Sequence, residues 1–173
     1  MTLLVVAYPH LTATDYAWIQ AIRHQHDPHA TLIAPHFTLV FPLETMDQGT
    51  LVNHITAHAQ QIPVIAFVIR CATIVKDALS AQTHLFLVPD EGHSALIKFH
   101  AALYTGILAP ARRLDVPFIP HITVGAHTDP YRCTQVAEAI NQHELCIRGQ
   151  LPTVDILRYA HNRVATVHRI ALR

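Results

Sequence analysis

The stretch 35-PHFTLVF-41 has a counterpart later in the chain, 120-PHITV-124. Each begins with a proline and continues as a short run of apolar, β-branched and aromatic residues, which is typical of a buried strand. Side chains along a strand alternate between two faces, so His36 shares a face with Thr38, and His121 shares a face with Thr123. Each expected strand therefore presents an imidazole beside a hydroxyl.

Three further His-x-Thr matches begin at His10, His29 and His54, and their surroundings differ. The first lies between an apolar strand and a helical stretch, where a threonine is better read as a helix N-cap. The second lies in a polar segment that predicts a loop. The third falls in a probable helix, residues 47–61, where positions i and i+2 do not share a face. Only His36 and His121 open a strand.

An internal repeat relates these two strands. Each copy reads as an apolar strand, a proline, a helix, a loop and a Pro-His-x-Thr strand. The first copy comprises residues 3–9, 15–26 and 35–41, and the second comprises residues 85–89, 91–108 and 120–124. A duplicated unit with one His-Thr pair per copy predicts two pairs that face each other across a pseudo-twofold axis.

This pairing suits the cleavage of a phosphodiester. Without a metal, that reaction needs a base on the attacking oxygen and an acid on the leaving oxygen, and histidine can take either role near neutral pH. The two oxygens lie roughly in line across the phosphorus, and threonine hydroxyls can donate to its other oxygens. The alternative is that both histidines are buried core residues and both threonines simply good strand residues.

The stretches 36-HFTL-39 and 121-HITVG-125 resemble the two motifs of the two-histidine (2H) phosphoesterases, in particular the branch described as 2′-5′ RNA ligase-like. The resemblance implies an α+β protein with a bilobed, duplicated fold, in which two mainly antiparallel sheets face a central cleft. It implies that His36, Thr38, His121 and Thr123 are catalytic. Many members carry a basic residue three positions after the second threonine, where this chain has Ala126 followed by His127.

The same resemblance implies a substrate class, which the residues by themselves do not. We expect a cyclic phosphodiesterase or 2′-5′ RNA ligase-like hydrolase that needs no cofactor. Its substrate would be a nucleotide or RNA terminus with a 2′,3′-cyclic phosphate or a 2′-5′ linkage. In the reverse reaction, the same site could join a cyclic phosphate end to a hydroxyl. The residues do not say which histidine is the base.

Length and composition favour a single compact domain over residues 1–173. The chain is 51% hydrophobic and 14% charged, with 12 Lys and Arg balancing 12 Asp and Glu. That balance argues against binding long duplexes, which depends on many basic contacts to phosphates. The N-terminal apolar run has no basic start or cleavage site, and the run 62–75 is interrupted by Arg70 and too short to span a membrane. We expect a cytoplasmic monomer.

Five side chains are candidates for substrate binding. Arg112 and Arg113 are the only adjacent arginines and could contact a phosphate. Tyr8, Phe41 and Tyr159 could stack on a base. The alternatives are that the arginines are solvated surface groups and that the aromatic residues pack in the core.

Two other functions remain open at this point. A non-catalytic module could use the same cleft to bind a nucleotide or RNA end. A metal-binding protein could use the surplus of the 15 histidines, such as His54 with His58 or His24 with His26 and His29. A zinc site would still lack further ligands in a recognisable spacing. Turnover of a cyclic nucleotide would distinguish a phosphodiesterase from a non-catalytic binding module. Metal analysis would distinguish it from a metal-binding protein.

Overall fold

The computed structural model describes residues 2–77 and 80–173, and Ala78 and Leu79 of the expected 76–82 turn lie outside that description. Within these ranges, eight strands form one antiparallel sheet in the order β6-β3-β4-β5-β2-β1-β7-β8. The strands are β1 (Thr2–Ala7), β2 (Phe37–Leu43), β3 (Ile65–Lys76), β4 (Thr83–Glu91), β5 (Ile122–His127), β6 (Ile147–Leu151), β7 (Thr153–Ala160) and β8 (Arg163–Ala171). The helices are α1 (Ala13–His26), α2 (Gln48–Ala59), α3 (His93–Leu103), the 3₁₀ helix η1 (Gly106–Ala111) and α4 (Pro130–Asn141).

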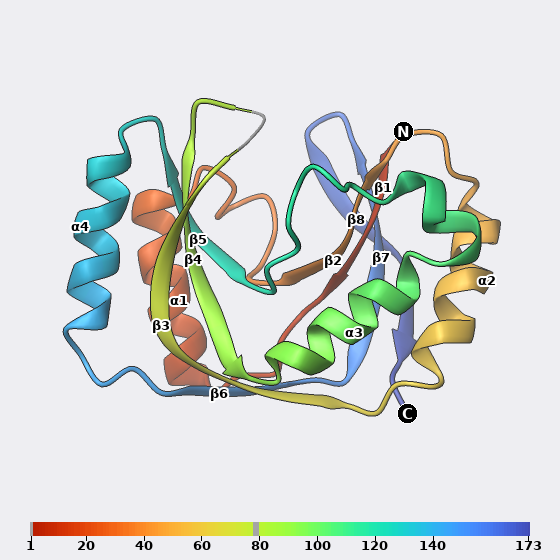
Figure 1. The fold of residues 1–173 in the computed structure, drawn as a ribbon, viewed down its shortest axis with the longest axis horizontal. Coiled ribbons are helices and arrows are strands. Elements are labelled where there is room, and N and C mark those ends of the chain that lie inside the picture. Colours follow the sequence, from red (N-terminus) through yellow and green to blue (C-terminus); the bar gives the residue numbers. More distant parts are fainter. Residues whose placement is uncertain (1, 78–79) are drawn as a thin grey trace.

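The sheet divides into two halves with the same topology. The left half in Figure 1 comprises β6, β3, β4 and β5, and the right half comprises β2, β1, β7 and β8. In each half, the first strand of a repeat lies between its own His-x-Thr strand and a third strand: β1 lies between β2 and β7, and β4 lies between β5 and β3. The duplication expected from the sequence is therefore present in the strand order.

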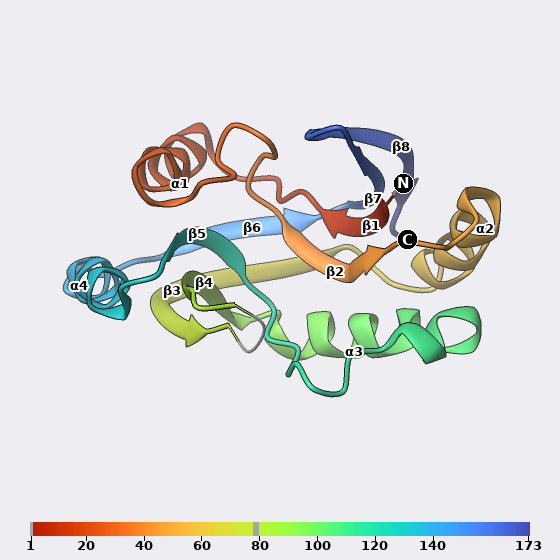
Figure 2. The same cartoon turned by 90° about the horizontal axis from the view of Figure 1, so that it is seen from above.

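The helices follow the same symmetry. α1 leaves β1 in the right half and packs on β5, and α3 leaves β4 in the left half and contacts β2 as well as β4 and β3. Figures 1 and 2 show α1 and α4 over the left half and α2 and α3 over the right half. This exchange places the loop that follows each crossing helix next to the junction between the halves.

The junction between the halves corrects one expectation. Instead of two separate sheets, the structure has one continuous, strongly bent sheet, because β2 and β5 are hydrogen-bonded neighbours. Within the described residues, their register pair is Phe37 with Ile122. Because β2 and β5 pair at one position only among the described residues, the two halves of the sheet can diverge on either side of that pair while the sheet remains continuous.

Local sequence signals account for the ends of several helices. Thr12 caps α1 by accepting the backbone N–H of Asp15, and Asp129 caps α4, with Pro130 in its first turn. The helix expected over residues 91–108 is shorter. β4 continues to Glu91, and Gly92 begins α3 at a φ of 81° where an added Cβ would lie 2.4 Å from the Ala66 carbonyl oxygen. α3 ends at Leu103, and the chain continues as η1, which contains Pro110.

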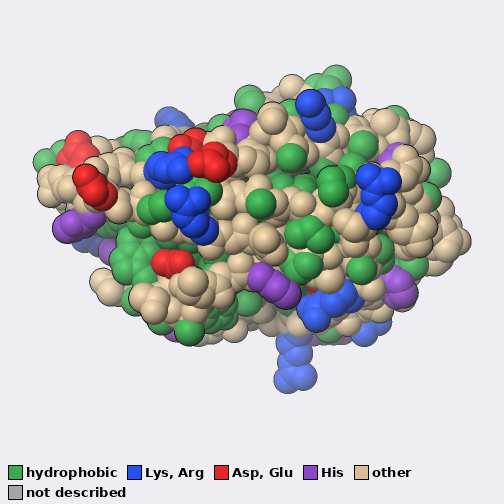
Figure 3. All heavy atoms as spheres, turned by 90° about the horizontal axis from the view of Figure 1, so that it is seen from below, with side chains coloured by type: hydrophobic (Ala, Val, Ile, Leu, Met, Phe, Trp, Pro, Cys, Tyr) green, Lys and Arg blue, Asp and Glu red, His purple; other side chains and the backbone are tan. Residues whose placement is uncertain are grey.

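Two observations concern the helices and the molecular surface. Within the described ranges, none of the helices combines the length and apolarity needed to cross a membrane. On the face drawn in Figure 3, basic side chains of the described residues are scattered or lie beside acidic ones. That face offers no continuous basic surface of the kind that binds a nucleic-acid duplex.

Candidate active site

The two His-x-Thr pairs meet at the junction between the halves. His36 immediately precedes β2, His121 immediately precedes β5, and the pair Phe37–Ile122 lies between them. Continuing this antiparallel register by one residue places His36 opposite Thr123 and Thr38 opposite His121. All four side chains then share one face of the sheet, since they alternate with the buried pair. Phe37 is 1% exposed and Ile122 is 0% exposed on the opposite face.

Each imidazole is oriented by the same local hydrogen bond. Nδ1 of His36 lies 2.8 Å from the carbonyl oxygen of Ala34, and Nδ1 of His121 lies 2.6 Å from that of Ile119. A carbonyl only accepts, so Nδ1 carries the proton and donates it in both rings. The neutral tautomer then leaves the lone pair on Nε2, which makes no hydrogen bond within the described part of the chain. Both rings present the nitrogen needed for proton transfer.

The pKa of each imidazole is lowered to about 4 from its usual 6.5. Burial is the main cause for both, and the hydrogen bonds from Nδ1 to the backbone oppose it. The positive charge of Arg23 lowers the pKa of His36 further, and a charge on His36 or His84 lowers that of His121.

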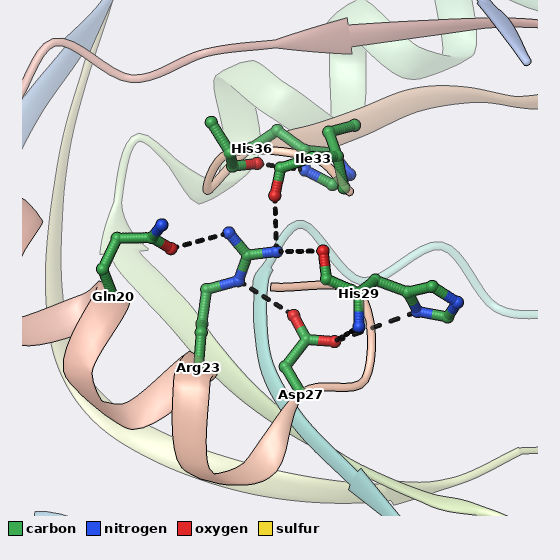
Figure 4. Close-up of polar contacts among 7 residues, drawn as sticks. Gln20, Arg23, Asp27, His29, Ile33 and His36 are labelled. Atoms are coloured by element: carbon green, nitrogen blue, oxygen red, sulfur yellow. Dashed lines mark hydrogen bonds and ion pairs between the residues drawn. The ribbon is translucent and has the colours of Figure 1, made fainter. Parts of the chain in front are cut away.

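A buried arginine supports the loop that leads into His36 (Figure 4). Arg23 on α1 is 1% exposed, and its Nε donates to the Asp27 carboxylate at 2.8 Å. Its Nη atoms donate to the Gln20 side chain at 2.8 Å and to the Ile33 carbonyl at 2.8 Å. Asp27 also accepts the backbone N–H of His29 at 2.9 Å. These bonds tie residues 27–33 to α1 just before the Ala34 carbonyl that orients His36.

A corresponding set of bonds ties α3 to β2. His100 Nδ1 lies 2.9 Å from the Leu39 carbonyl oxygen, and the Phe41 backbone N–H donates to the Tyr104 hydroxyl at 2.9 Å. The His100 ring stacks on Phe118 at a centroid distance of 3.6 Å, which holds the loop before His121. Burial lowers the pKa of His100. Neither Arg23 nor His100 was predicted from the sequence, although each is a polar residue on the apolar face of a helix, which is a usable signal.

Aromatic stacking distinguishes His121 from His36. The Phe86 ring stacks on His121 with centroids 3.4 Å apart and planes 14° apart, and His84 stacks on Phe86 at 5.7 Å. In the register of β4 and β5, His84 is the cross-strand neighbour of Ala126. An imidazole therefore lies beside the position where the resemblance implied a basic residue.

A cavity of about 890 Å³ adjoins His121 and Thr123. Its wall is largely apolar and includes Phe41, Phe86, Val116 and Ile119, with Arg112 and Arg113 also lining it. The cavity reaches the end of β2 on one side and the turn between β3 and β4 on the other. Acidic as well as basic side chains line this apolar space, which suits a flat ring with a charged group attached.

Four of the five predicted binding residues lie at this site. Phe41, Arg112 and Arg113 line the cavity, and Arg113 is also paired with Asp115 at 2.7 Å from its Nε. Tyr8 lies outside the cavity, with its ring centroid 6.2 Å from that of His36. Tyr159 is not among the cavity residues; it lies near the end of β7, where its hydroxyl contacts the Asn162 side chain at 3.3 Å.

The histidines considered for a metal make other contacts. His54 and His58 lie with their ring centroids 4.6 Å apart, and the Nε2 of His54 lies 2.8 Å from the Leu103 carbonyl oxygen. Among the described residues, no group of three or more His, Cys, Asp or Glu side chains is placed to hold a metal ion. His54 therefore links α2 to the end of α3.

Comparison with known proteins identifies the family and the fold. The family model described as the 2′-5′ RNA ligase superfamily matches residues 9–163. A protein of Geobacillus sp. (strain WCH70), provisionally named a phosphoesterase, is 28% identical over 121 residues, which span 70% of this chain and 66%, just under two thirds, of that protein. The structure of TT0787 of Thermus thermophilus covers 100% of this chain and 98% of its own, with a TM-score of 0.63 and 13% identity.

A second solved structure, E. coli LigT complexed with 3′-AMP, covers 98% of this chain and 96% of its own at a TM-score of 0.56 and 18% identity. These structures share the curled antiparallel α+β fold. The fold and the match define the class as the two-histidine phosphoesterases, as the motifs predicted. The chain belongs to the 2′-5′ RNA ligase superfamily.

Proposed function

We propose that this protein is a metal-independent phosphodiesterase that hydrolyses 2′,3′-cyclic phosphates or 2′-5′ linkages of nucleotides or RNA ends. One observation carries the proposal: two His-x-Thr pairs flank the Phe37–Ile122 junction on one face, and each imidazole has its Nδ1 occupied by the backbone. A phosphate between the rings would have a proton carrier on each side. The Thr38 and Thr123 hydroxyls would donate to its non-bridging oxygens.

The nucleoside is proposed to occupy the apolar cavity beside His121. Phe41 provides a ring surface against which a base can pack, and Arg112 and Arg113 provide positive charge at the cavity wall. A nucleotide, 3′-AMP, is bound in the E. coli LigT structure of the same fold. This placement directs the ribose oxygen of the scissile bond toward His121.

The surroundings of the two rings favour different roles. The buried Arg23 cation disfavours a charge on His36, which suits a neutral general base. The face of Phe86 lies against His121, and an aromatic face attracts a cation, which suits a protonated general acid. In hydrolysis, His36 takes a proton from a water molecule while the water oxygen forms a bond to phosphorus. His121 gives a proton to the ribose oxygen while the bond between that oxygen and phosphorus breaks.

The products of a cyclic phosphate are then one free ribose hydroxyl and one phosphate monoester. Exchange with solvent moves the proton from His36 and returns one to His121. When a second RNA chain takes the place of water, His36 would take the proton from its terminal hydroxyl, and the hydroxyl oxygen would attack the cyclic phosphate. The same pair can therefore support ligation of RNA ends.

The direct test is hydrolysis of adenosine 2′,3′-cyclic phosphate and of a 2′-5′-linked diadenosine with EDTA present. We expect turnover of at least one substrate, undiminished by the chelator, because the two imidazoles supply both proton transfers. Activity that is lost with EDTA and restored by added zinc would contradict the proposal and indicate a metal-bound hydroxide. Tight binding of both substrates without turnover would instead identify a binding module.

The pH dependence provides a second test. The reactive form carries one proton on the pair, and the pKa of each ring in the free protein is about 4. As pH rises above that value both rings become neutral, so kcat/KM should have an acidic optimum and fall toward neutral pH. A bound phosphate favours the protonated form, so the optimum of kcat should lie at higher pH. A kcat/KM that rises from pH 6 to 9 would contradict this.

Stability must be followed in the same experiment. The unfolded pKa of histidine, near 6.5, exceeds the folded pKa of about 4 for both His36 and His121. Between these values the unfolded chain binds more protons, so the folded protein loses stability as pH falls from about 6.5 to about 4. Circular dichroism at each pH separates acid unfolding from the titration of the site.

A further inference from the structure

A row of side chains crosses the right half of the sheet from the site to its edge. In the strand registers, Thr38 of β2 pairs with Val6 of β1, Val6 pairs with Asp155 of β7, and Asp155 pairs with Arg169 of β8. Directly paired residues point to the same face of a sheet. Asp155 and Arg169 therefore lie on the face that carries the two catalytic pairs, at the end of a row that begins with Thr38.

Asp155 and Arg169 form an ion pair whose two members differ in exposure. The Asp155 side chain is 0% exposed, and one of its oxygens accepts from Nε of Arg169 at 2.8 Å. The Arg169 side chain is 60% exposed, and its Nη atoms make no hydrogen bond within the described residues. A guanidinium has five N–H donors, so one bond from Nε anchors the group and leaves its outer edge available to an anion.

The left half shows that the fold itself does not require this pair. There Phe86 of β4 pairs with Thr123, as Val6 pairs with Thr38 on the right, and the next residue in that row is Thr73 of β3. Thr73 is exposed and uncharged, at the position equivalent to the buried Asp155. The two halves therefore offer different surfaces to a substrate: stacked rings on the left and an anchored cation on the right.

Tyr8 connects the ion pair to the site. Its ring centroid lies 6.2 Å from that of His36. Tyr8 directly follows β1, two residues after Val6, which is the cross-strand partner of Asp155. Burial and, to a smaller extent, the Asp155 carboxylate raise the pKa of Tyr8 to about 12, and the Arg169 charge opposes this. The Tyr8 hydroxyl makes no hydrogen bond within the described residues. The surrounding segment 156–173 contains four arginines and no acidic residue.

We propose that Arg169, anchored by Asp155 and close to Tyr8, binds a second phosphate of the substrate. The first phosphate, at the 2′ and 3′ oxygens of the nucleoside, lies between His36 and His121. The second phosphate is attached to the 5′ oxygen of the same nucleoside. Adjacent strands are about 4.8 Å apart. The Arg169 guanidinium is bonded to Asp155 on β7, two strands from β2, and so lies roughly 10 Å from Thr38, too far to share the scissile phosphate. One ribose separates the two phosphates of such a substrate. This inference rests on the proposed function and makes the site selective for 5′-phosphorylated or chain-terminal nucleotides.

The test compares ligands that differ only at the 5′ oxygen. Three cyclic substrates are adenosine 2′,3′-cyclic phosphate, its 5′-phosphorylated form, and a dinucleotide ending in a 2′,3′-cyclic phosphate. Arg169→Ala should raise KM by about 10–100-fold for the last two, since a charge-assisted hydrogen bond is lost, and leave the first within about twofold. If KM rises only for the 5′-phosphorylated mononucleotide, Arg169 binds a terminal phosphate monoester. If KM rises only for the dinucleotide, Arg169 binds a phosphodiester of the chain.

The matched control is Arg163→Ala, an exposed arginine on the same strand whose neighbour Val164 pairs with Tyr159. This variant should change none of the three KM values. If Arg169→Ala weakens all three substrates equally, or none, the second phosphate site is wrong, although the phosphodiesterase activity stands.

A binding measurement keeps the inference testable if hydrolysis itself is absent. Calorimetric titration with adenosine 3′-phosphate and adenosine 3′,5′-bisphosphate compares one phosphate with two, without any reaction. Wild-type protein should bind the bisphosphate more tightly, and Arg169→Ala should lose that preference. Equal affinities in the wild-type protein would overturn the inference.

Discussion

Replacing either His36 or His121 with alanine is expected to lower kcat/KM by about 10²–10⁴-fold, the usual contribution of a general acid or base. The two losses should not add in the double variant, because a proton must be both removed and delivered for one turnover. The measurement is steady-state hydrolysis of adenosine 2′,3′-cyclic phosphate, with thermal unfolding of each variant recorded alongside.

The matched control is His143→Ala, an exposed histidine that follows α4 outside the site. It should retain full activity. A His36 or His121 variant that keeps normal activity per folded molecule while losing stability would show that these residues are buried core histidines. That outcome would remove the basis of the proposed mechanism.

Replacing Arg23 with methionine is expected to lower the free energy of unfolding by about 3–5 kcal/mol. The reason is that the Asp27 carboxylate, only 3% exposed, would be left as a buried charge without its partner. The carbonyl of Ile33 would also lose its donor. Urea unfolding at pH 7 measures the change. Because the loop that orients His36 depends on these bonds, activity should fall as well.

Two further variants test whether the buried charge is the cause. Adding Asp27→Asn to Arg23→Met removes the stranded charge and keeps an oxygen for the backbone N–H of His29, so part of the stability should return. Arg70→Ala breaks an exposed pair with Asp90 and Glu91, and should cost much less. An Arg23→Met loss as small as that of Arg70→Ala would contradict the assigned role.

Much of the fold could be predicted because its signals are local. The apolar runs, the caps at Thr12 and Asp129, and the repeat of strand, helix and Pro-His-x-Thr strand required only short-range patterns. The errors came where the decision was not local. β4 runs past Pro89, because its partner β3 continues to pair with it as far as the pair Val68–Glu91. α3 ends at Leu103, before Gly106 and Pro110, and not at Leu108.

The candidate site divides in the same way. By itself the sequence determined that His36 and Thr38 share a face, and that His121 and Thr123 do, because side chains alternate along any strand. Only the tertiary structure decided that the two pairs adjoin at Phe37–Ile122, that Phe86 stacks on His121, and which nitrogen of each ring is free.

The buried charges depended on the tertiary structure most of all. In the sequence, Asp155 and Arg169 look like ordinary charged residues, and nothing near them in the chain says which of them water surrounds. The burial of Asp155 and its pairing with Arg169 follow from the register of β7 and β8 and from the packing around them. The periodicity of apolar residues in the sequence specifies which face of a strand or helix a side chain occupies. The packing of the whole chain decides what lies against that face.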